Sequence, residues 1–370
     1  MTVASTPDEI VSAVAAYGLP GARPFATAVL DDATWRAVLD RSTRDRLTPL
    51  LASAVADGLL PTSARQHHQA TAAHEQSMRL CVLLERAMLE VAAALDASGI
   101  PFRVLKGPAV AHLDYADPAQ RAFGDVDVLV DASAYDTALE VLHAAGARRR
   151  FTEVRPGFDR RWGKGACLVT PDGTQIDVHR TFVAGPFGLT IDLDELMAAP
   201  AFFTVGGRSV PALDRESRFL HACFHAALGD QVARPVALRD VAQLILTTDM
   251  DREVVMARAE RWRADGVVAR AVRLTWSRLA LAPDPWADWA AGHQADRFQT
   301  RALRAYTTES RSYATQVTAG LAAVRGVPEK VAYMRALLLT NPEHLRARDQ
   351  TYPRRIRRAW QAFVSTRGAR

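Results

Sequence analysis

The sequence predicts an α+β fold in which a small mixed sheet is flanked by helices and by longer helical regions at both ends of the chain. Short runs rich in β-branched and aliphatic residues at 102–106, 125–130, 166–170 and 174–180 indicate strands. Helical patterns at 108–115 and 133–145 separate the first of them, and a further strand is expected near 148–154. The turn sequence Pro171-Asp172-Gly173 between the last two runs predicts a hairpin.

Amphipathic helical patterns lie on both sides of this central segment. Residues 31–56 and 76–99 carry apolar side chains at helical spacing, and Gly99 suits the end of the second helix. After Pro200 the pattern is helical again. We therefore expect an N-terminal helical region at 1–95, a core at 96–205 and a C-terminal helical domain at 206–370.

The composition argues against several classes of protein. The chain has no apolar run long enough to span a membrane, and its first residues, which include Asp8 and Glu9, lack the basic start of a secretory signal. Cys81, Cys167 and Cys223 are odd in number and scattered, which argues against a disulfide framework or a zinc knuckle. We therefore expect a cytoplasmic protein without a membrane partner.

Positive charge is concentrated in the last part of the chain. Residues 201–370 contain 27 Lys and Arg against 16 Asp and Glu, whereas residues 1–200 contain 19 against 25. Such a basic part can attract a polyanion, and the arginines of the tail at 346–370 could bind RNA or acidic lipid. The alternative is host composition, because only three of the 46 cations are lysines, as is typical of a high-GC genome. Nucleic acid therefore stays open as a partner but is not favoured.

The most informative stretch places two aspartates on one predicted strand. Asp125 and Asp127 alternate with valines, so both side chains project from the same face, about 7 Å apart. Like charges at that separation repel each other, and a divalent cation with hard oxygen ligands removes the repulsion. Asp177 has the same aliphatic setting on a later predicted strand. The three acids predict a site for Mg²⁺ or Mn²⁺ on one sheet.

The order of these motifs resembles the nucleotidyltransferase superfamily of the DNA polymerase β type. That superfamily carries a glycine turn after a first strand, an acidic-x-acidic strand and a third acid on a later strand. A closer resemblance, over about residues 80–245, is to the bacterial family described as uncharacterised nucleotidyltransferases. The residues that carry it are Leu105, Lys106, Gly107, Tyr115, Asp117, Pro118, Arg121, Asp125 and Asp127. The chain departs from the superfamily at Pro108, where many members have Ser or Gly.

The resemblance implies an enzyme that transfers NMP from an NTP to a hydroxyl group, with Mg²⁺ or Mn²⁺ as cofactor. The acceptor could be a small molecule such as a natural product, a protein or an RNA end. Asp125 and Asp127 would bridge two metal ions. Asp177 would hold the metal at the acceptor hydroxyl and accept the proton of that hydroxyl.

Several residues are expected to bind the nucleotide. Gly107 would allow phosphate to approach the backbone, and the helix N-terminus that follows favours an anion. Lys106 is a rare lysine in an arginine-rich chain and suits a phosphate. Arg121 could clamp the triphosphate or form an ion pair with an acidic residue, and both alternatives stay open.

Two further groups of residues are expected near the nucleotide or the acceptor. Between residues 148 and 164, seven cations have only two acids as sequence neighbours. The segment is either a solvated loop or a basic lid in which Arg160, Arg161 and Lys164 bind phosphate. In the resembling family, a similar histidine helix precedes an aspartate. His225 and Asp240 would accordingly shape the base or acceptor pocket, with a packing role as the alternative.

A second class of function also stays open. The chain could be a non-catalytic binding module of the nucleotidyltransferase fold, whose basic C-terminal region contacts nucleic acid or a protein partner. Steep salt dependence of binding, without a metal requirement, would identify it.

Overall fold

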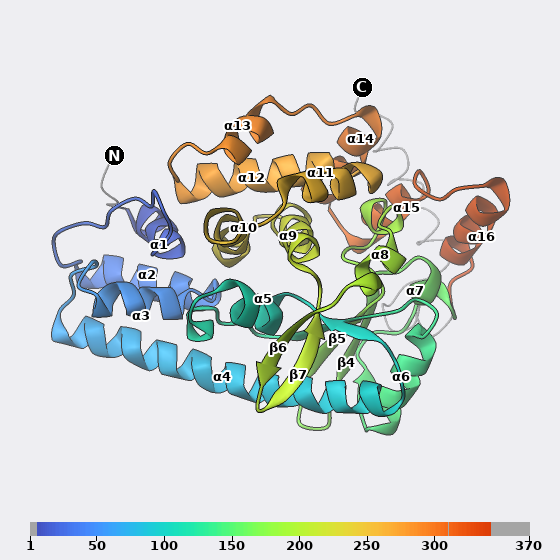
Figure 1. The fold of residues 1–370 in the computed structure, drawn as a ribbon, viewed down its shortest axis with the longest axis horizontal. Helices are drawn as coiled ribbons and strands as arrows, with labels where there is room; N and C mark the ends of the chain where they lie inside the picture. Colours follow the sequence, from blue (N-terminus) through green and yellow to red (C-terminus); the bar gives the residue numbers. More distant parts are fainter. Residues whose placement is uncertain (1–5, 310, 342–370) are drawn as a thin grey trace.

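The computed structural model describes residues 6–309 and 311–341, so the arginine-rich tail at 346–370 lies outside the described residues. The described residues form a seven-stranded mixed sheet with helices on both faces, which confirms the predicted α+β class (Figure 1). The strands are β1 (Phe102–Val104), β2 (Val126–Val130), β3 (Arg148–Arg149), β4 (Gly165–Val169), β5 (Gln175–His179), β6 (Ala201–Val205) and β7 (Arg208–Ala212).

Helices precede, connect and follow these strands. Those before the sheet are α1 (Pro7–Ala16), α2 (Asp32–Arg44), α3 (Thr48–Ala56) and α4 (Ala64–Ala97). Those between strands are α5 (Lys106–Asp114), η1 (Pro118–Gln120), α6 (Tyr135–Ala144), α7 (Phe158–Arg161), η2 (Phe187–Leu189) and α8 (Leu193–Ala198). Those after the sheet are α9 (Arg215–Phe224), the π-helical turn η3 (His225–Gly229), α10 (Pro235–Thr247), α11 (Arg252–Arg261), α12 (Asp265–Leu279), α13 (Pro285–Gly292), α14 (Arg297–Thr307), α15 (Tyr313–Gly320) and α16 (Val327–Leu338).

The acidic strand β2 lies in the middle of the sheet, whose strand order is β3-β4-β5-β2-β1-β7-β6. It runs antiparallel to β1 and parallel to β5, and the register with β5 sets Asp127 opposite Asp177. Strands β4 and β5 form the predicted hairpin, which is closed by a hydrogen bond from the Thr170 amide to the Thr174 carbonyl at 2.9 Å.

The prediction of helix directly after Pro200 is wrong, because β6 and β7 form a second hairpin there. Gly206 and Gly207, with φ of 57° and 77°, supply the left-handed backbone that a tight hairpin turn requires. Strand β7 pairs with β1 through Val104 and Ala212. The sheet therefore continues beyond residue 205, at which we expected the core to end.

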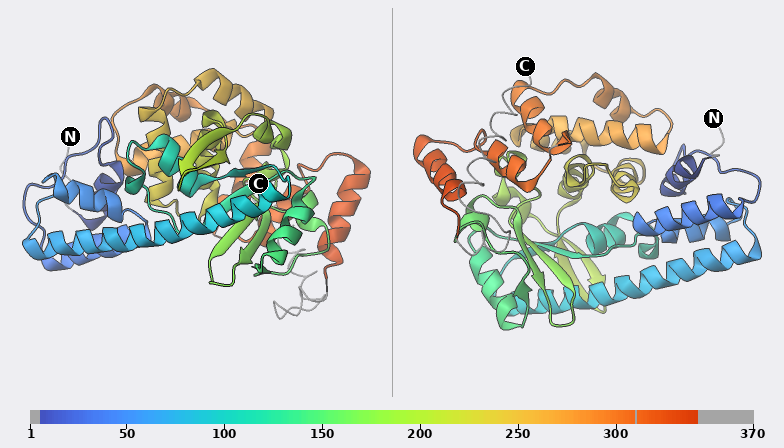
Figure 2. Two further views of the ribbon diagram at one scale, coloured as in Figure 1. Left: turned by 60° about the horizontal axis from the view of Figure 1, so that its bottom comes forward. Right: turned by 180° about the vertical axis from the view of Figure 1, so that it is seen from behind.

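Helix α4 is longer than the sequence pattern indicated. Its 34 residues begin at a capping box formed by Ser63 and Gln66, so the polar stretch before residue 76 belongs to the same helix. Figure 2 shows it running from beside α2 and α3 to the underside of the sheet. Its second half packs against the strands through one apolar stripe.

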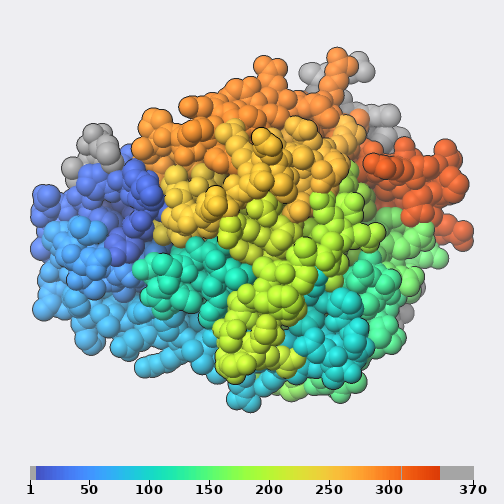
Figure 3. Space-filling model, in the orientation of Figure 1, coloured from blue at the N-terminus to red at the C-terminus, as the bar shows by residue number. Residues whose placement is uncertain are grey.

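The sheet is therefore the middle one of three layers. Helices α4 and α6 share one apolar cluster with the strands on one face. On the other face, Leu105 and Leu129 belong to a larger cluster that contains side chains of α1 to α3 and of α9 to α14. The N-terminal helices thus pack against the C-terminal helices rather than forming a separate core, and they adjoin them at the surface (Figure 3). No helix among residues 6–309 and 311–341 is both long and apolar enough to cross a lipid bilayer.

Candidate functional site

The centre of the site is formed by three side chains on the parallel strands β2 and β5. The register sets Asp127 opposite Asp177 and Leu129 opposite His179. Because side chains alternate along a strand, Asp177 and His179 project from one face, and Asp127 shares its face with Leu129. One ligand atom from each of Asp127, Asp177 and His179 lies within 4.8 Å of the other two. The site therefore faces the helices that pack over Leu129.

Asp127 is held in its charged form by two partners. Its Oδ1 lies 2.8 Å from Nε2 of His179, and its Oδ2 lies 2.9 Å from Nζ of Lys106. Burial alone would raise the pKa of this carboxyl group. The ammonium of Lys106 and the hydrogen bond with His179 outweigh burial and hold the pKa well below its usual value.

Lys106 lies between the two aspartates of the acidic strand. Its Nζ is 3.3 Å from Oδ2 of Asp125 as well as 2.9 Å from Asp127. Burial lowers the pKa of this ammonium, but Asp127 and Asp125 outweigh it and the pKa is raised. Asp125 also lies 3.5 Å from a guanidinium nitrogen of Arg46, which the N-terminal helical region contributes.

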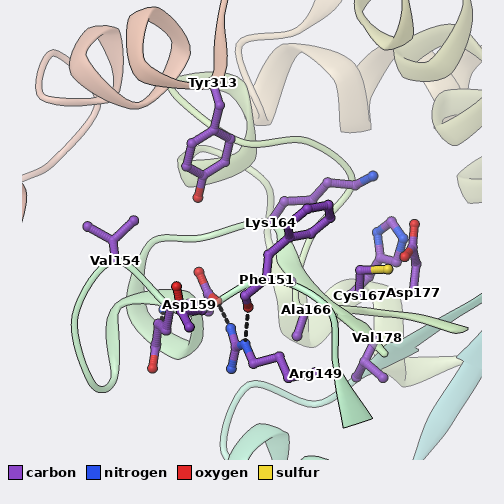
Figure 4. Close-up of a pocket in the computed structure, with 14 residues that line it drawn as sticks. Arg149, Phe151, Val154, Asp159, Lys164, Ala166, Cys167, Asp177, Val178 and Tyr313 are labelled. Atoms are coloured by element: carbon purple, nitrogen blue, oxygen red, sulfur yellow. Dashed lines mark hydrogen bonds and ion pairs between the residues drawn. The ribbon is translucent and has the colours of Figure 1, made fainter. Parts of the chain in front are cut away.

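A cavity of about 290 Å³ adjoins Asp177 and His179. Figure 4 shows Asp177 and Asp159 at opposite ends of this cavity, with Lys164 between them. Burial and the charge of Lys106 lower the pKa of Lys164, although Asp127 and Asp177 oppose that shift. Beside β5, the structure thus offers a partly open pocket whose walls carry charges of both signs.

Arg121 and Asp240 do not line this cavity, and they bind each other. Two nitrogens of the Arg121 guanidinium each lie 2.7 Å from an oxygen of the Asp240 carboxylate, and both side chains are buried. This favours the ion-pair alternative for Arg121 over the triphosphate clamp. The same ion pair favours a structural role for Asp240 over a place in the base or acceptor pocket.

Of the three cations expected in the lid, only Lys164 lines the cavity. Arg160 lies 3.2 Å from Asp136 of α6, and Arg161 lies 2.8 Å from Glu329 of α16. The fold thus gives both arginines acidic partners from distant parts of the chain, in addition to the two acids among their sequence neighbours. The segment is also anchored by an aromatic cluster formed by Phe158, Trp162 and Tyr333.

Gly107 and His225 also have close packing neighbours. A β-carbon at Gly107 would lie 3.1 Å from the β-carbon of Phe123, so packing alone already favours glycine at this point. His225 lies where α9 passes into η3, and burial with the charge of Lys106 lowers its pKa well below the usual value. Neither residue lines the cavity beside Asp177.

Two residues of the site were missed by the sequence analysis. His179 follows Asp177 by two positions, so strand alternation alone could have placed it on the same face. Arg46 reaches Asp125 from the turn between α2 and α3, and such a distant contact leaves no local signal.

The arrangement of a glycine turn after β1, an acidic strand β2 and a further acid on β5 is the one that the resemblance to nucleotidyltransferases implies. The chain belongs to the family described as uncharacterised nucleotidyltransferase, whose sequence model matches residues 31–279. Among solved structures, it is similar to an antigenic nucleotidyltransferase-like protein from Paracoccidioides brasiliensis. That similarity has 17% identity and a TM-score of 0.31, and it covers 59% of this chain and 96% of the other. None of the curated proteins matches the sequence.

Proposed function

We propose that this chain is a cytoplasmic, metal-dependent nucleotidyltransferase that moves NMP from an NTP to a hydroxyl group of an acceptor. The observation that carries the proposal is the meeting of Asp127, Asp177 and His179 within 4.8 Å beside a cavity. Membership of the nucleotidyltransferase family supports the reaction class.

The residues present fit a divalent ion. Asp127, Asp177 and His179 would hold it through two carboxylate oxygens and one imidazole nitrogen, a donor set that suits Mn²⁺ and accepts Mg²⁺. When bound, the ion stabilises negative charge on the oxygens that react at phosphorus.

The chain's own residues supply the remaining functions. Asp177 lines the cavity, so an acceptor bound there can pass its hydroxyl proton to this carboxylate. The acceptor oxygen then forms a bond to the α-phosphorus, while the bond from that phosphorus to the bridging oxygen of pyrophosphate breaks. Lys164, which lines the cavity, would contact the phosphates, and the N-terminus of α5 near Gly107 would add positive partial charge.

Release of pyrophosphate from each labelled NTP, with Mg²⁺ or Mn²⁺ and an extract of the host, tests the proposal. We expect one NTP to be consumed and one extract component to become labelled. Asp177→Asn should lower the rate at least about a hundredfold, because it removes both a metal ligand and the proton acceptor. The matched control is Glu140→Gln, an exposed acid on α6 at the opposite face of the sheet. Equal rates in the two variants would refute the assignment.

The second candidate is a non-catalytic binding module. Lys106 favours it, because a lysine already neutralises the acidic pair without a metal ion. Such a module would bind RNA with steep salt dependence, and neither Mg²⁺ nor NTP would raise its melting temperature. An NTP-dependent rise in melting temperature would exclude it.

A further inference from the structure

We propose that the ammonium group of Lys106 takes the place of one of the two divalent ions expected between Asp125 and Asp127, so that this site binds a single divalent ion. The inference rests on the proposed function. It assigns the remaining ion to Asp127, Asp177 and His179.

The first argument for this inference is the position of Lys106. Its Nζ contacts Oδ2 of Asp125 at 3.3 Å and Oδ2 of Asp127 at 2.9 Å, which is the place where an ion bridging these carboxylates would lie. The other oxygen of Asp127 faces His179 at 2.8 Å. Asp127 therefore offers one oxygen to the lysine and the other to the side of the site on which Asp177 lies.

The backbone at Lys106 gives the second argument. The φ of 60° at Arg46 belongs to the common left-handed end of α2, where the amides of Arg46 and Leu47 bond to the carbonyls of Thr43 and Ser42 at 3.2 and 2.7 Å. Lys106, with a φ of 28°, lies at the start of α5, where no helix end requires a positive φ. Such strain at a non-glycine residue costs free energy and is typical of sites where a side chain is held for function.

The third argument is the balance of charge among the side chains of the site. The site contains three carboxylates, those of Asp125, Asp127 and Asp177. Three cations act on them: Arg46 and Lys106 form ion pairs with them, and Lys164 lies close enough for its charge to interact with theirs. A second divalent ion between Asp125 and Asp127 would have to displace the ammonium or stand beside it, and like charges at such a distance repel each other strongly. One ion on the side of His179 avoids that conflict.

Binding of Mn²⁺ to the full chain without nucleotide tests the inference, with the stoichiometry measured by electron paramagnetic resonance and by calorimetry. We expect one ion per wild-type chain. Lys106→Met, which keeps the length of the side chain and removes its charge, should admit a second ion or bind Mn²⁺ at least tenfold more tightly. Lys106→Arg should keep the stoichiometry at one. The matched control is Lys330→Met, which changes an exposed lysine on α16 and should leave binding unchanged.

The outcomes separate this inference from the proposed function. Two ions on the wild-type chain, with Lys106→Met unchanged, would overturn the role of Lys106 and leave the nucleotidyltransferase assignment standing. If the wild-type chain binds no Mn²⁺, so that it cannot be distinguished from Asp177→Asn, the metal site is overturned. The proposed function is then overturned with it. Should Lys106→Met fail to fold, Lys106→Met with Asp125→Asn removes one charge of each sign. We expect one ion on that variant, and two would contradict the inference.

Discussion

Arg121 and Asp240 form a two-pronged ion pair between segments that are 119 residues apart in the chain. Both donor–acceptor distances are 2.7 Å, and the hydroxyl of Tyr115 donates to the same carboxylate at 3.0 Å. The pair joins the segment that leads into β2 to helix α10. Both side chains are buried, so an ion pair shielded from solvent connects the segment before the acidic strand to the C-terminal helices.

Removal of one partner of this pair should be costly. Asp240→Ala leaves the Arg121 guanidinium buried without its counter-charge, and we expect a loss of about 3–5 kcal/mol in the free energy of unfolding. Urea unfolding followed by circular dichroism measures it. The double variant Arg121→Met with Asp240→Leu should lose less, because no unpaired charge is left. A stable Asp240→Ala protein with weakened NTP binding would instead support a direct role in the nucleotide pocket.

Lys164 and the two arginines before it should differ in their effects. We expect Lys164→Met to weaken binding of NTP or acceptor by about tenfold or more, because its ammonium lines the cavity beside Asp177. Arg160→Ala with Arg161→Ala removes two exposed ion pairs and should change stability by less than about 1 kcal/mol for each pair. Values of KM and kcat for both variants provide the comparison. If Lys164→Met and the double arginine variant lose the same activity, Arg160 and Arg161 also bind phosphate.

Hydrogen exchange should divide the segment 148–164 into two parts. Amides at 158–162 should be protected with and without nucleotide, because Phe158 and Trp162 are buried in the aromatic cluster with Tyr333. Amides at 151–156 should exchange quickly in the isolated protein and slowly with NTP and Mg²⁺, as expected for a lid. Asp177→Asn serves as the control that lacks the nucleotide-dependent change. Fast exchange over 158–162 would show that the cluster does not anchor the segment.

Asp159 should give stability a dependence on pH. Burial raises its pKa from 3.8 to about 7, with Arg149 opposing the shift and Glu153 adding to it. Between these values the folded protein binds a proton that the unfolded chain does not, so this contribution to stability is complete below about pH 4 and is lost as the pH rises to about 7. The difference in unfolding free energy between wild type and Asp159→Asn should follow that course. Parallel curves for the two proteins from pH 4 to 8 would contradict it.

The strands that form the site could be predicted from local patterns, but their pairing could not. Alternation marked β2 and β5, and the turn before β5 marked its hairpin with β4. The parallel register of β2 with β5 has no local signal, because it depends on the long connection between the two strands. The hairpin of β6 and β7 was missed although Gly206-Gly207 is a turn signal. Pro211 within β7 interrupts the pattern of a strand.

The charges of the site were predictable only in part. Asp127, Asp177 and Lys106 were found from residue type and spacing, and the structure brings these three together. The acids that pair with Arg160 and Arg161 could not be found, since they come from α6 and α16 and carry no motif. Counting charges among sequence neighbours therefore overstated the positive charge available to a triphosphate.

The packing of α1 against the C-terminal helices also determines when the chain can finish folding. Arg239 of α10 donates to the Ala15 carbonyl at 3.0 Å, and α1 shares its apolar cluster with α10 and α12. Roughly 220 residues separate α1 from α10, so roughly 10–45 s pass during synthesis before these partners leave the ribosome. During that time the apolar face of α1 has no native surface to cover it. A nascent chain that ends before α10 therefore leaves the apolar face of α1 without its native partners, which is the kind of exposed surface that chaperones bind.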